Sequence, residues 1–149
     1  MLDINKSVAK FFDDGCDKCG DSGWRAAYWL SEEYQYGTYL VLSSILDSSS
    51  NSVLDLGCGQ GDYYCFLKRH LYQQYAYYEG IDISGKMIHY ARQRFPEATF
   101  LQKDFLDEDF NNEYDHIVGA GTFNYRVDNQ EDYIKLCISK MYRLAKKIY

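Results

Sequence analysis

VLDLGCGQG, at residues 53–61, is the stretch that decides the fold class of this 149-residue chain. Its first four residues are typical of a short buried strand, and three glycines follow within five positions. Because glycine has no Cβ, Gly57, Gly59 and Gly61 allow backbone angles and a close approach of a ligand that other residues forbid. The stretch therefore predicts a tight turn from a strand into a helix, at the edge of a sheet where α/β proteins bind ligands.

The alternation of strand and helix continues from this turn to the end of the chain. Apolar residues at helical spacing predict a helix over residues 63–75, and Ser84 and Pro96 mark the start and the end of a second helix. The other predicted elements are strands at 53–56, 77–83, 98–102 and 114–120 and a last helix from about residue 129 to the end. This order implies right-handed crossovers and a parallel sheet covered on both faces.

Upstream of a polar run at residues 47–52, which reads as a loop, the sequence favours helices. Apolar and aromatic residues recur at helical spacing from Trp24 to Leu46, and Gly37 predicts a break in this pattern. The chain therefore combines a helical N-terminal region with an α/β core, and its length is that of one domain.

The composition is that of a soluble globular domain, with 46% hydrophobic and 26% charged residues. The net charge of −6 is spread along the chain, so no face can collect the 16 Lys and Arg without acidic neighbours, which argues against a nucleic-acid partner. No stretch approaches the roughly 20 apolar residues of a membrane helix, and no secretory signal begins the sequence. We therefore expect a cytoplasmic protein without a membrane partner.

The 17% aromatic content could fill a core, line a pocket or cover a partner surface.

Cysteines and histidines give no sign of a metal site. The five cysteines are an odd number without the density of a disulfide scaffold, so we expect reduced thiols. Cys16 and Cys19 could be half of a zinc site, but zinc takes four ligands and no second such pair exists, so we expect a plain loop there. His70 and His89 are expected to be structural, and His116 is expected to be packed early in the fourth strand.

Residues 53–61 also resemble motif I of the class I, Rossmann-like methyltransferases, which use S-adenosylmethionine (SAM) and carry an acidic residue before GxGxG. Nucleotide-binding Rossmann domains place GxGxxG at the same point, but here the sixth position is Asp62. A carboxylate at the N-terminus of the helix would repel the pyrophosphate of a dinucleotide, whereas SAM has no phosphate. Asp62 therefore favours a methyltransferase over a nucleotide-dependent oxidoreductase.

Two further carboxylates follow at the intervals of the family. Asp82 ends the second strand, where Rossmann-like folds place the acid that accepts from both ribose hydroxyls. The resemblance implies that Asp104 accepts from the adenine amino group, with Phe105 or Ile83 against the ring. The predicted cofactor-binding residues are Asp55, Gly57, Cys58, Gly59, Gly61, Asp82, Ile83, Asp104, Phe105 and Gly119.

The segment after the fourth strand matches motif IV of the family in position. It departs from the Asn/Asp-Pro-Pro-Tyr version found in many amino-group methyltransferases of nucleic acids and proteins, so we expect a small-molecule acceptor. Asn124 and Tyr125 are candidates for orienting the acceptor, and the sequence shows no committed catalytic base.

The N-terminal helices resemble the lid and substrate-facing segment of the family. On this interpretation residues 1–50 form a helical lid and residues 51–149 form the SAM-binding core. Gln35 could cap the methionine end of the cofactor together with neighbouring tyrosines. The tyrosines that could line the site are Tyr28, Tyr34, Tyr36 and Tyr125.

The sheet of the family has seven strands in the order 3-2-1-4-5-7-6. This chain resembles only the first four, so we expect it to be truncated relative to the family fold. Strand four would then be an uncovered edge with unpaired backbone groups. We expect a second copy in a homodimer, a partner chain, or the remainder of a longer enzyme to cover it. Because the SAM contacts come from strands one to four, the alternative to an active enzyme is a SAM-binding module, or pseudoenzyme, that acts through a partner.

Overall fold

A computed structural model describes residues 2–46, 52–70 and 77–146 of the chain. The helices are α1 (Leu2–Cys19), α2 (Gly23–Ala26), α3 (Glu32–Ser44), α4 (Asp62–His70), α5 (Gly85–Arg94) and α6 (Gln130–Leu144). The strands are β1 (Ser52–Leu56), β2 (Tyr77–Asp82), β3 (Thr99–Gln102) and β4 (His116–Val118). They form one parallel sheet in the order β3-β2-β1-β4, which confirms the predicted α/β fold class and the expected order of the first four strands.

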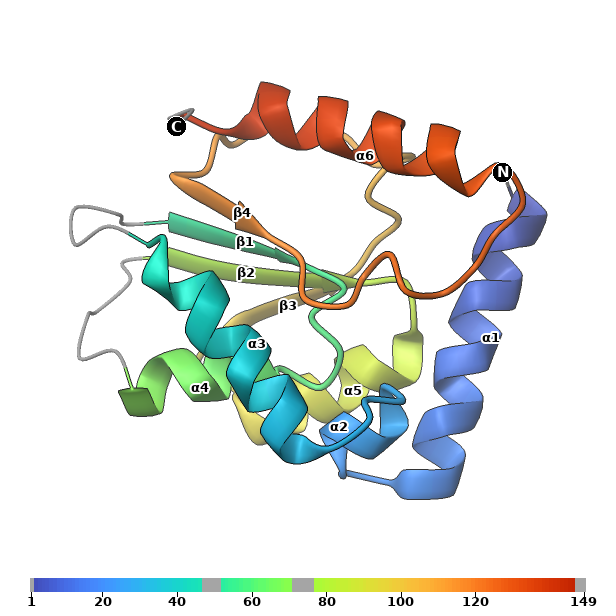
Figure 1. Ribbon diagram of the computed structural model, residues 1–149, viewed down its shortest axis with the longest axis vertical. Helices are drawn as coiled ribbons and strands as arrows, with labels where there is room; N and C mark the ends of the chain where they lie inside the picture. The colour runs from blue at the N-terminus through green and yellow to red at the C-terminus, as the bar shows by residue number, and fades with distance from the viewer. Residues whose placement is uncertain (1, 47–51, 71–76, 147–149) are drawn as a thin grey trace.

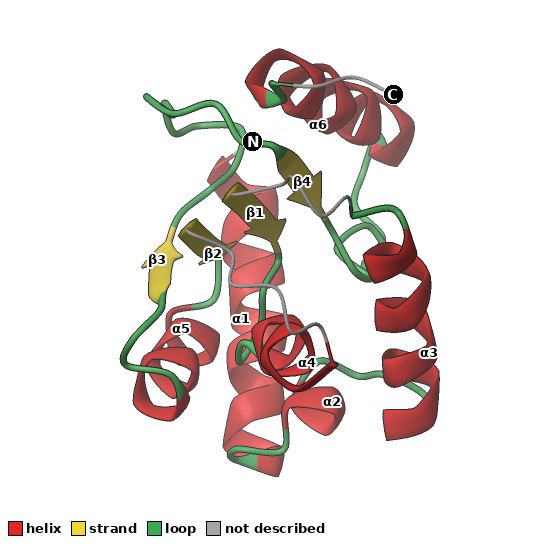
Figure 2. Cartoon of the chain, turned by 90° about the vertical axis from the view of Figure 1, so that its left-hand side faces the viewer, coloured by secondary structure: helices red, strands yellow, loops and turns green. Residues whose placement is uncertain are grey.

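Helices cover both faces of this sheet (Figure 1). The helices α3, α4 and α5 lie on one side, α6 crosses the other, and α1 stands across the carboxyl ends of the strands. In Figure 2, β3 and β4 form the two edges of the sheet. Side chains of β1 alternate between the two layers, because Val53 packs in the cluster with α3, α4 and α5, whereas Leu54 and Leu56 pack in the cluster with α6. All five residues of β1 are buried, as expected for a central parallel strand.

The helix α5 begins where the sequence predicts, at the N-cap Ser84. The Ser84 Oγ accepts a hydrogen bond from the backbone N–H of Met87 at 3.1 Å and donates one to Oδ1 of Asp13 at 2.5 Å. Since Asp13 belongs to α1, this buried hydroxyl both caps α5 and attaches α1 to the core.

We expect the substitution Ser84→Ala to lower the free energy of unfolding by about 1–2 kcal/mol, because an N-cap contributes about 1 kcal/mol and Asp13 loses a donor as well. Urea unfolding of both proteins measures the difference. Ser44→Ala is the matched control, since the Ser44 hydroxyl is exposed and donates to the Val41 carbonyl of its own helix. An equal loss in both variants would contradict the assigned role of Ser84.

Two predictions about the N-terminal half are wrong. The helix α3 continues through Gly37, and the break lies instead between α2 and α3, where Tyr28 has a φ of +56° and Ser31 caps α3. The cost of one helical glycine, about 1 kcal/mol, is offset by the packing of Tyr39 into the core. The predicted loop at Cys16 and Cys19 is the end of α1, because apolar residues recur at helical spacing along residues 8–19.

All five cysteines carry free thiols. Within residues 2–46, 52–70 and 77–146, no group of three or more potential ligands is placed to hold a metal ion. Over the same described ranges, no helix has the length and apolar character needed to cross a bilayer.

The structure tests the predicted bounds of several elements only in part. The helix α4 is described from Asp62 to His70, and residues 71–75 of the predicted helix at 63–75 lie outside the described part of the chain, as does the predicted loop at 47–52 except for Ser52, the first residue of β1. The last helix ends at Leu144 because the backbone becomes extended at Ala145. There the N–H of Tyr114 donates to the Leu144 carbonyl at 2.9 Å, and the N–H of Lys146 donates to the Tyr114 carbonyl at 2.8 Å.

The strand β4 is shorter than the predicted strand at 114–120. Tyr114 forms a single parallel bridge with Ala145, and β4 itself comprises only residues 116–118. In the described part of the chain, β4 pairs only with β1. Beyond the Tyr114–Ala145 bridge, no other strand lies along its outer edge.

Candidate functional site

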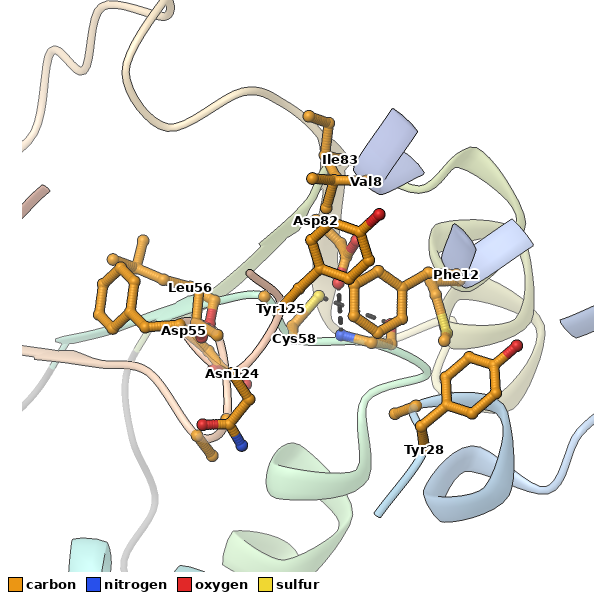
Figure 3. A pocket seen from close by; sticks show the side chains of 18 of the residues that line it. Val8, Phe12, Tyr28, Asp55, Leu56, Cys58, Asp82, Ile83, Asn124 and Tyr125 are labelled. Atoms are coloured by element: carbon orange, nitrogen blue, oxygen red, sulfur yellow. Dashed lines mark hydrogen bonds between the residues drawn. The ribbon is translucent and has the colours of Figure 1, made fainter. Parts of the chain in front are cut away.

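A cavity of about 470 Å³ opens at the carboxyl ends of the strands (Figure 3). Its wall comes from the turn after β1, the ends of β2 and β3, the segment after β4, the helix α1 and the α2–α3 connection. This volume is in the range of small-molecule and cofactor sites. Eight of the predicted cofactor-binding residues lie in the wall: Asp55, Gly57, Cys58, Gly59, Asp82, Ile83, Asp104 and Phe105.

The glycine turn after β1 has the backbone geometry that the sequence predicts. Gly57, Gly59 and Gly61 have φ values of +67°, +54° and +80°, a region that side chains with a Cβ rarely adopt. The N–H groups of Gly57 and Cys58 donate to the carbonyl of Ile81 at 2.8 and 3.0 Å. These bonds hold the turn against the end of β2, beside the cavity.

The surroundings of Gly57 and Gly59 differ in a way that matters for ligand binding. A Cβ at Gly57 would lie 2.9 Å from Oγ1 of Thr122, whereas a Cβ at Gly59 would meet only Sδ of Met87, at 3.9 Å. Gly57 is therefore required by close packing as well as by its backbone angle. Gly59 has room around it because it borders the cavity.

Asp82 closes β2 with both carboxylate oxygens engaged by the backbone. Its Oδ2 accepts from the N–H of Gly59 at 2.9 Å, and its Oδ1 accepts from the N–H of Ser84 at 2.8 Å. Burial raises the pKa of Asp82, although the two backbone donors partly oppose this shift. The carboxylate is held in place and keeps further lone pairs with which it can accept hydrogen bonds from a ligand.

Asp104 reaches the same cavity from the end of β3. Its Oδ1 accepts from the N–H of Leu106 at 3.0 Å, and its Oδ2 accepts from the side-chain amide of Asn5 on α1. Asn5 was not predicted to lie in the site, because it is far from Asp104 along the chain and the two residues share no motif.

Asp55 is the most deeply buried carboxyl group of the site, with 1% of its surface exposed. The hydroxyl of Tyr78 donates to its Oδ2 at 2.6 Å. The pKa of Asp55 is raised from 3.8 to about 7. Burial is the largest cause, the hydrogen bond from Tyr78 opposes it, and the negative charges of Asp82 and Asp62 add to it.

This raised pKa predicts a pH-dependent stability. The folded state binds the Asp55 proton more tightly than the unfolded state does, so the stabilisation is fully present below about pH 4 and is lost as the pH rises through about 7. Relative to Asp55→Asn, the wild-type protein should lose up to about 4 kcal/mol of unfolding free energy over that interval. Urea unfolding at about pH 5 and about pH 8 tests this. The control is Asp109→Asn, at an exposed carboxylate. Equal changes in wild type and Asp55→Asn would contradict the prediction.

The family model described as "Methyltransferase domain" matches residues 53–147, which is most of the chain. The chain belongs to the methyltransferase domain family. SAM is the cofactor of this family, as the sequence predicted.

Individual relatives agree with this family. The chain is 36% identical over 106 residues to a malonyl-[acyl-carrier protein] O-methyltransferase of Acetivibrio thermocellus, a match that covers 68% of this chain and 36% of the relative. The chain spans about half the length, or less, of the curated relatives it matches.

Two solved methyltransferase structures are similar to the fold of this methyltransferase domain. The magnesium protoporphyrin IX methyltransferase of Synechocystis PCC 6803, solved with bound SAM, has a TM-score of 0.66 at 21% identity, covering 98% of this chain and 74% of that one. A Haloferax volcanii methyltransferase in complex with a methyltransferase activator has a TM-score of 0.67 at 22% identity, covering 93% and 56%.

In this methyltransferase domain the carboxylate of Asp62 is paired. The Arg94 Nη1 lies 2.6 Å from its Oδ1, and the side-chain amide of Gln35 donates to its Oδ2 at 3.3 Å. Both Asp62 and Gln35 lie in the cavity wall. The Arg94 pair reduces the repulsion that Asp62 would exert on an anion, so Asp62 excludes a pyrophosphate less strongly than the sequence suggested.

Four aromatic rings gather on one side of the cavity, and we call them the four-ring cluster: Phe11 and Phe12 from α1, Tyr28 from the α2–α3 connection, and Tyr125 from the segment after β4. The ring centroid of Phe11 lies 4.4 Å from that of Tyr28 and 4.8 Å from that of Tyr125. Phe12 and Tyr125 are labelled in Figure 3 together with Cys58 and Asp82, and all four line the cavity. Three separate segments thus converge on one side of the cavity.

The remaining tyrosine predictions divide. Tyr34, like Tyr28 and Tyr125, lies in the cavity wall, and so does Asn124. Tyr36 does not; its ring packs against Phe66 and His70.

Gly61 and Gly119, which were predicted to bind the cofactor, pack behind the wall rather than in it. A Cβ at Gly61 would lie 2.9 Å from the ring of Phe100, and one at Gly119 would lie 3.1 Å from Oγ1 of Thr122. These two glycines allow close packing under the turn. All three histidines lie within the described residues and away from the cavity wall.

Proposed function

We propose that this chain forms the SAM-binding part of a methyltransferase that acts on a small molecule, with residues 1–50 as a lid over a core at 51–149. One observation carries the proposal: Asp82, Asp104 and the glycine turn after β1 border the same cavity at the carboxyl ends of the strands. Acceptors of hydrogen bonds at two strand ends, beside a turn that a ligand can approach closely, suit a nucleoside without phosphates.

The residues of the cavity fit SAM in size and charge. Asp82 would accept hydrogen bonds from the ribose hydroxyls, and Asp104 from the adenine amino group, with Ile83 and Phe105 beside the ring. The turn at Gly57 and Gly59 would face the methionine part.

The protein can promote methyl transfer mainly by positioning. When bound, SAM supplies a methyl group that is already activated for in-line displacement. The chain's own residues hold the donor, exclude water and orient the acceptor, and effective positioning alone can provide several kcal/mol of the barrier reduction. Asn124 and Tyr125, in the cavity wall after β4, would orient the acceptor.

The outer edge of β4 supports a second element of the proposal, which is that a further polypeptide segment covers this edge. A second copy of the chain, a partner chain or a continuation of the same chain would each do so. The same open edge favours the alternative function, a SAM-binding module that depends on a partner for activity.

Labelled SAM separates these functions. Purified protein is titrated with SAM and S-adenosylhomocysteine by calorimetry, then incubated with methyl-labelled SAM and a cytoplasmic metabolite extract, and its mass is measured by light scattering. Transfer of label to a small molecule supports the enzyme, and binding without transfer supports the module. Absence of binding by the folded protein would overturn both.

A further inference from the structure

The part of the cavity wall that is not assigned to SAM holds many aromatic rings. Among them are the four-ring cluster and Trp29. Tyr28 presents 43% of its surface to solvent and holds a left-handed backbone conformation at φ +56°. Such a conformation costs about 1 kcal/mol or more and concentrates at ligand sites. This wall offers flat faces to a flat molecule.

The segment after β4 also brings a positively charged side chain into the cavity wall. Arg126 follows Tyr125 directly in the wall, and no hydrogen bond or ion pair joins it to another residue of the described ranges. The other charged side chains of the wall have protein partners: Asp55 with Tyr78, Asp62 with Arg94, Asp82 with Gly59, Asp104 with Asn5, and Lys103 with Glu79.

We infer that the acceptor of the proposed methyltransferase is a planar molecule that carries an anionic group, and that Arg126 binds this group while the ring lies against the four-ring cluster. This inference rests on the proposed function, because it assigns the carboxylates of the cavity to SAM. A guanidinium pairs with a carboxylate through two parallel hydrogen bonds, which suits it to this task. A cationic acceptor would also be attracted to the aromatic faces, but Arg126 would repel it.

Three matched fluorescent probes test the inference: 1-hydroxy-2-naphthoate, its neutral amide 1-hydroxy-2-naphthamide, and the cationic 2-(aminomethyl)-1-naphthol. Each is titrated into the protein saturated with S-adenosylhomocysteine, and binding is followed by fluorescence anisotropy. We expect the carboxylate to bind at least about tenfold more tightly than the other two probes. Arg126→Gln should remove this preference and Arg126→Lys should keep part of it.

The controls separate the contacts. Arg69→Gln removes an exposed arginine at the end of α4, away from the cavity wall, and should leave the preference unchanged. Phe11→Leu should weaken the binding of all three probes to a similar extent, because it removes a ring and no charge. Affinity for S-adenosylhomocysteine, measured on each variant, shows that the fold and the cofactor site are intact.

Equal affinity for the three probes, a preference for the cation, or an unchanged preference in Arg126→Gln would overturn the inference while the proposed function stands. Failure of S-adenosylhomocysteine to bind would instead overturn the proposed function. In that case the same titrations without it still decide whether Arg126 selects an anion.

Discussion

Asp82→Ala is expected to weaken the binding of SAM and S-adenosylhomocysteine by at least about 100-fold. The reason is that hydrogen bonds to a charged group contribute about 1.5–3 kcal/mol each, and the carboxylate would accept two from the ribose. The substitution also removes the acceptor that holds the N–H of Gly59, so the turn itself becomes less ordered. Calorimetric titration of both ligands measures the loss.

Two further variants make this result interpretable. Asp82→Asn keeps one acceptor oxygen and should bind with an affinity between those of wild type and Asp82→Ala. Asp109→Ala, at an exposed carboxylate outside the cavity wall, should bind like wild type. Thermal unfolding identifies any variant that has lost its fold. Wild-type affinity in a folded Asp82→Ala protein would exclude Asp82 from the cofactor site.

Gly59→Val is expected to reduce SAM binding by about 100-fold or more while leaving the protein folded. The added Cβ meets only Sδ of Met87 within 4 Å, and the side chain borders the cavity in which the ligand would lie. The backbone strain at φ +54° costs about 1–2 kcal/mol, a tolerable fraction of the stability of a domain. Calorimetry reports the affinity, and urea unfolding reports the stability.

Gly57→Val should behave differently, although it lies two residues away. Its Cβ would press against Thr122 at 2.9 Å in addition to the strain at φ +67°, so we expect a markedly larger loss of stability. Gly37→Val, in α3 with no neighbour within 4 Å of the added Cβ, controls for the change of glycine to valine. Retention of SAM binding by Gly59→Val would place the ligand elsewhere.

Local patterns in the sequence predicted most of the core. The glycine turn required positive φ angles at Gly57, Gly59 and Gly61, and the structure has them. Ser84 stood at the position of an N-cap and forms one. Each of these features depends on residues within a few positions of one another, where propensity and backbone sterics decide the outcome.

The parts that were not predicted depend on contacts between distant segments. The bond between Asn5 and Asp104 and the pairing of Arg94 with Asp62 exist only once α1 and α5 have packed on the core. Gly37 did not break α3 because tertiary packing outweighed its low helix propensity. The left-handed conformation of Tyr28 has no signature in its residue type.

The three-residue length of β4 has a consequence for assembly. Main-chain pairing alone can bind any extended peptide, and it is the route by which sheets aggregate edge to edge. A very short edge strand, preceded by Tyr114 that is already bridged to Ala145, offers little for such pairing. A polypeptide that extends this sheet therefore has to gain its affinity from side chains. Because side chains differ between sequences and backbone groups do not, binding at this edge would depend on the sequence of the partner segment.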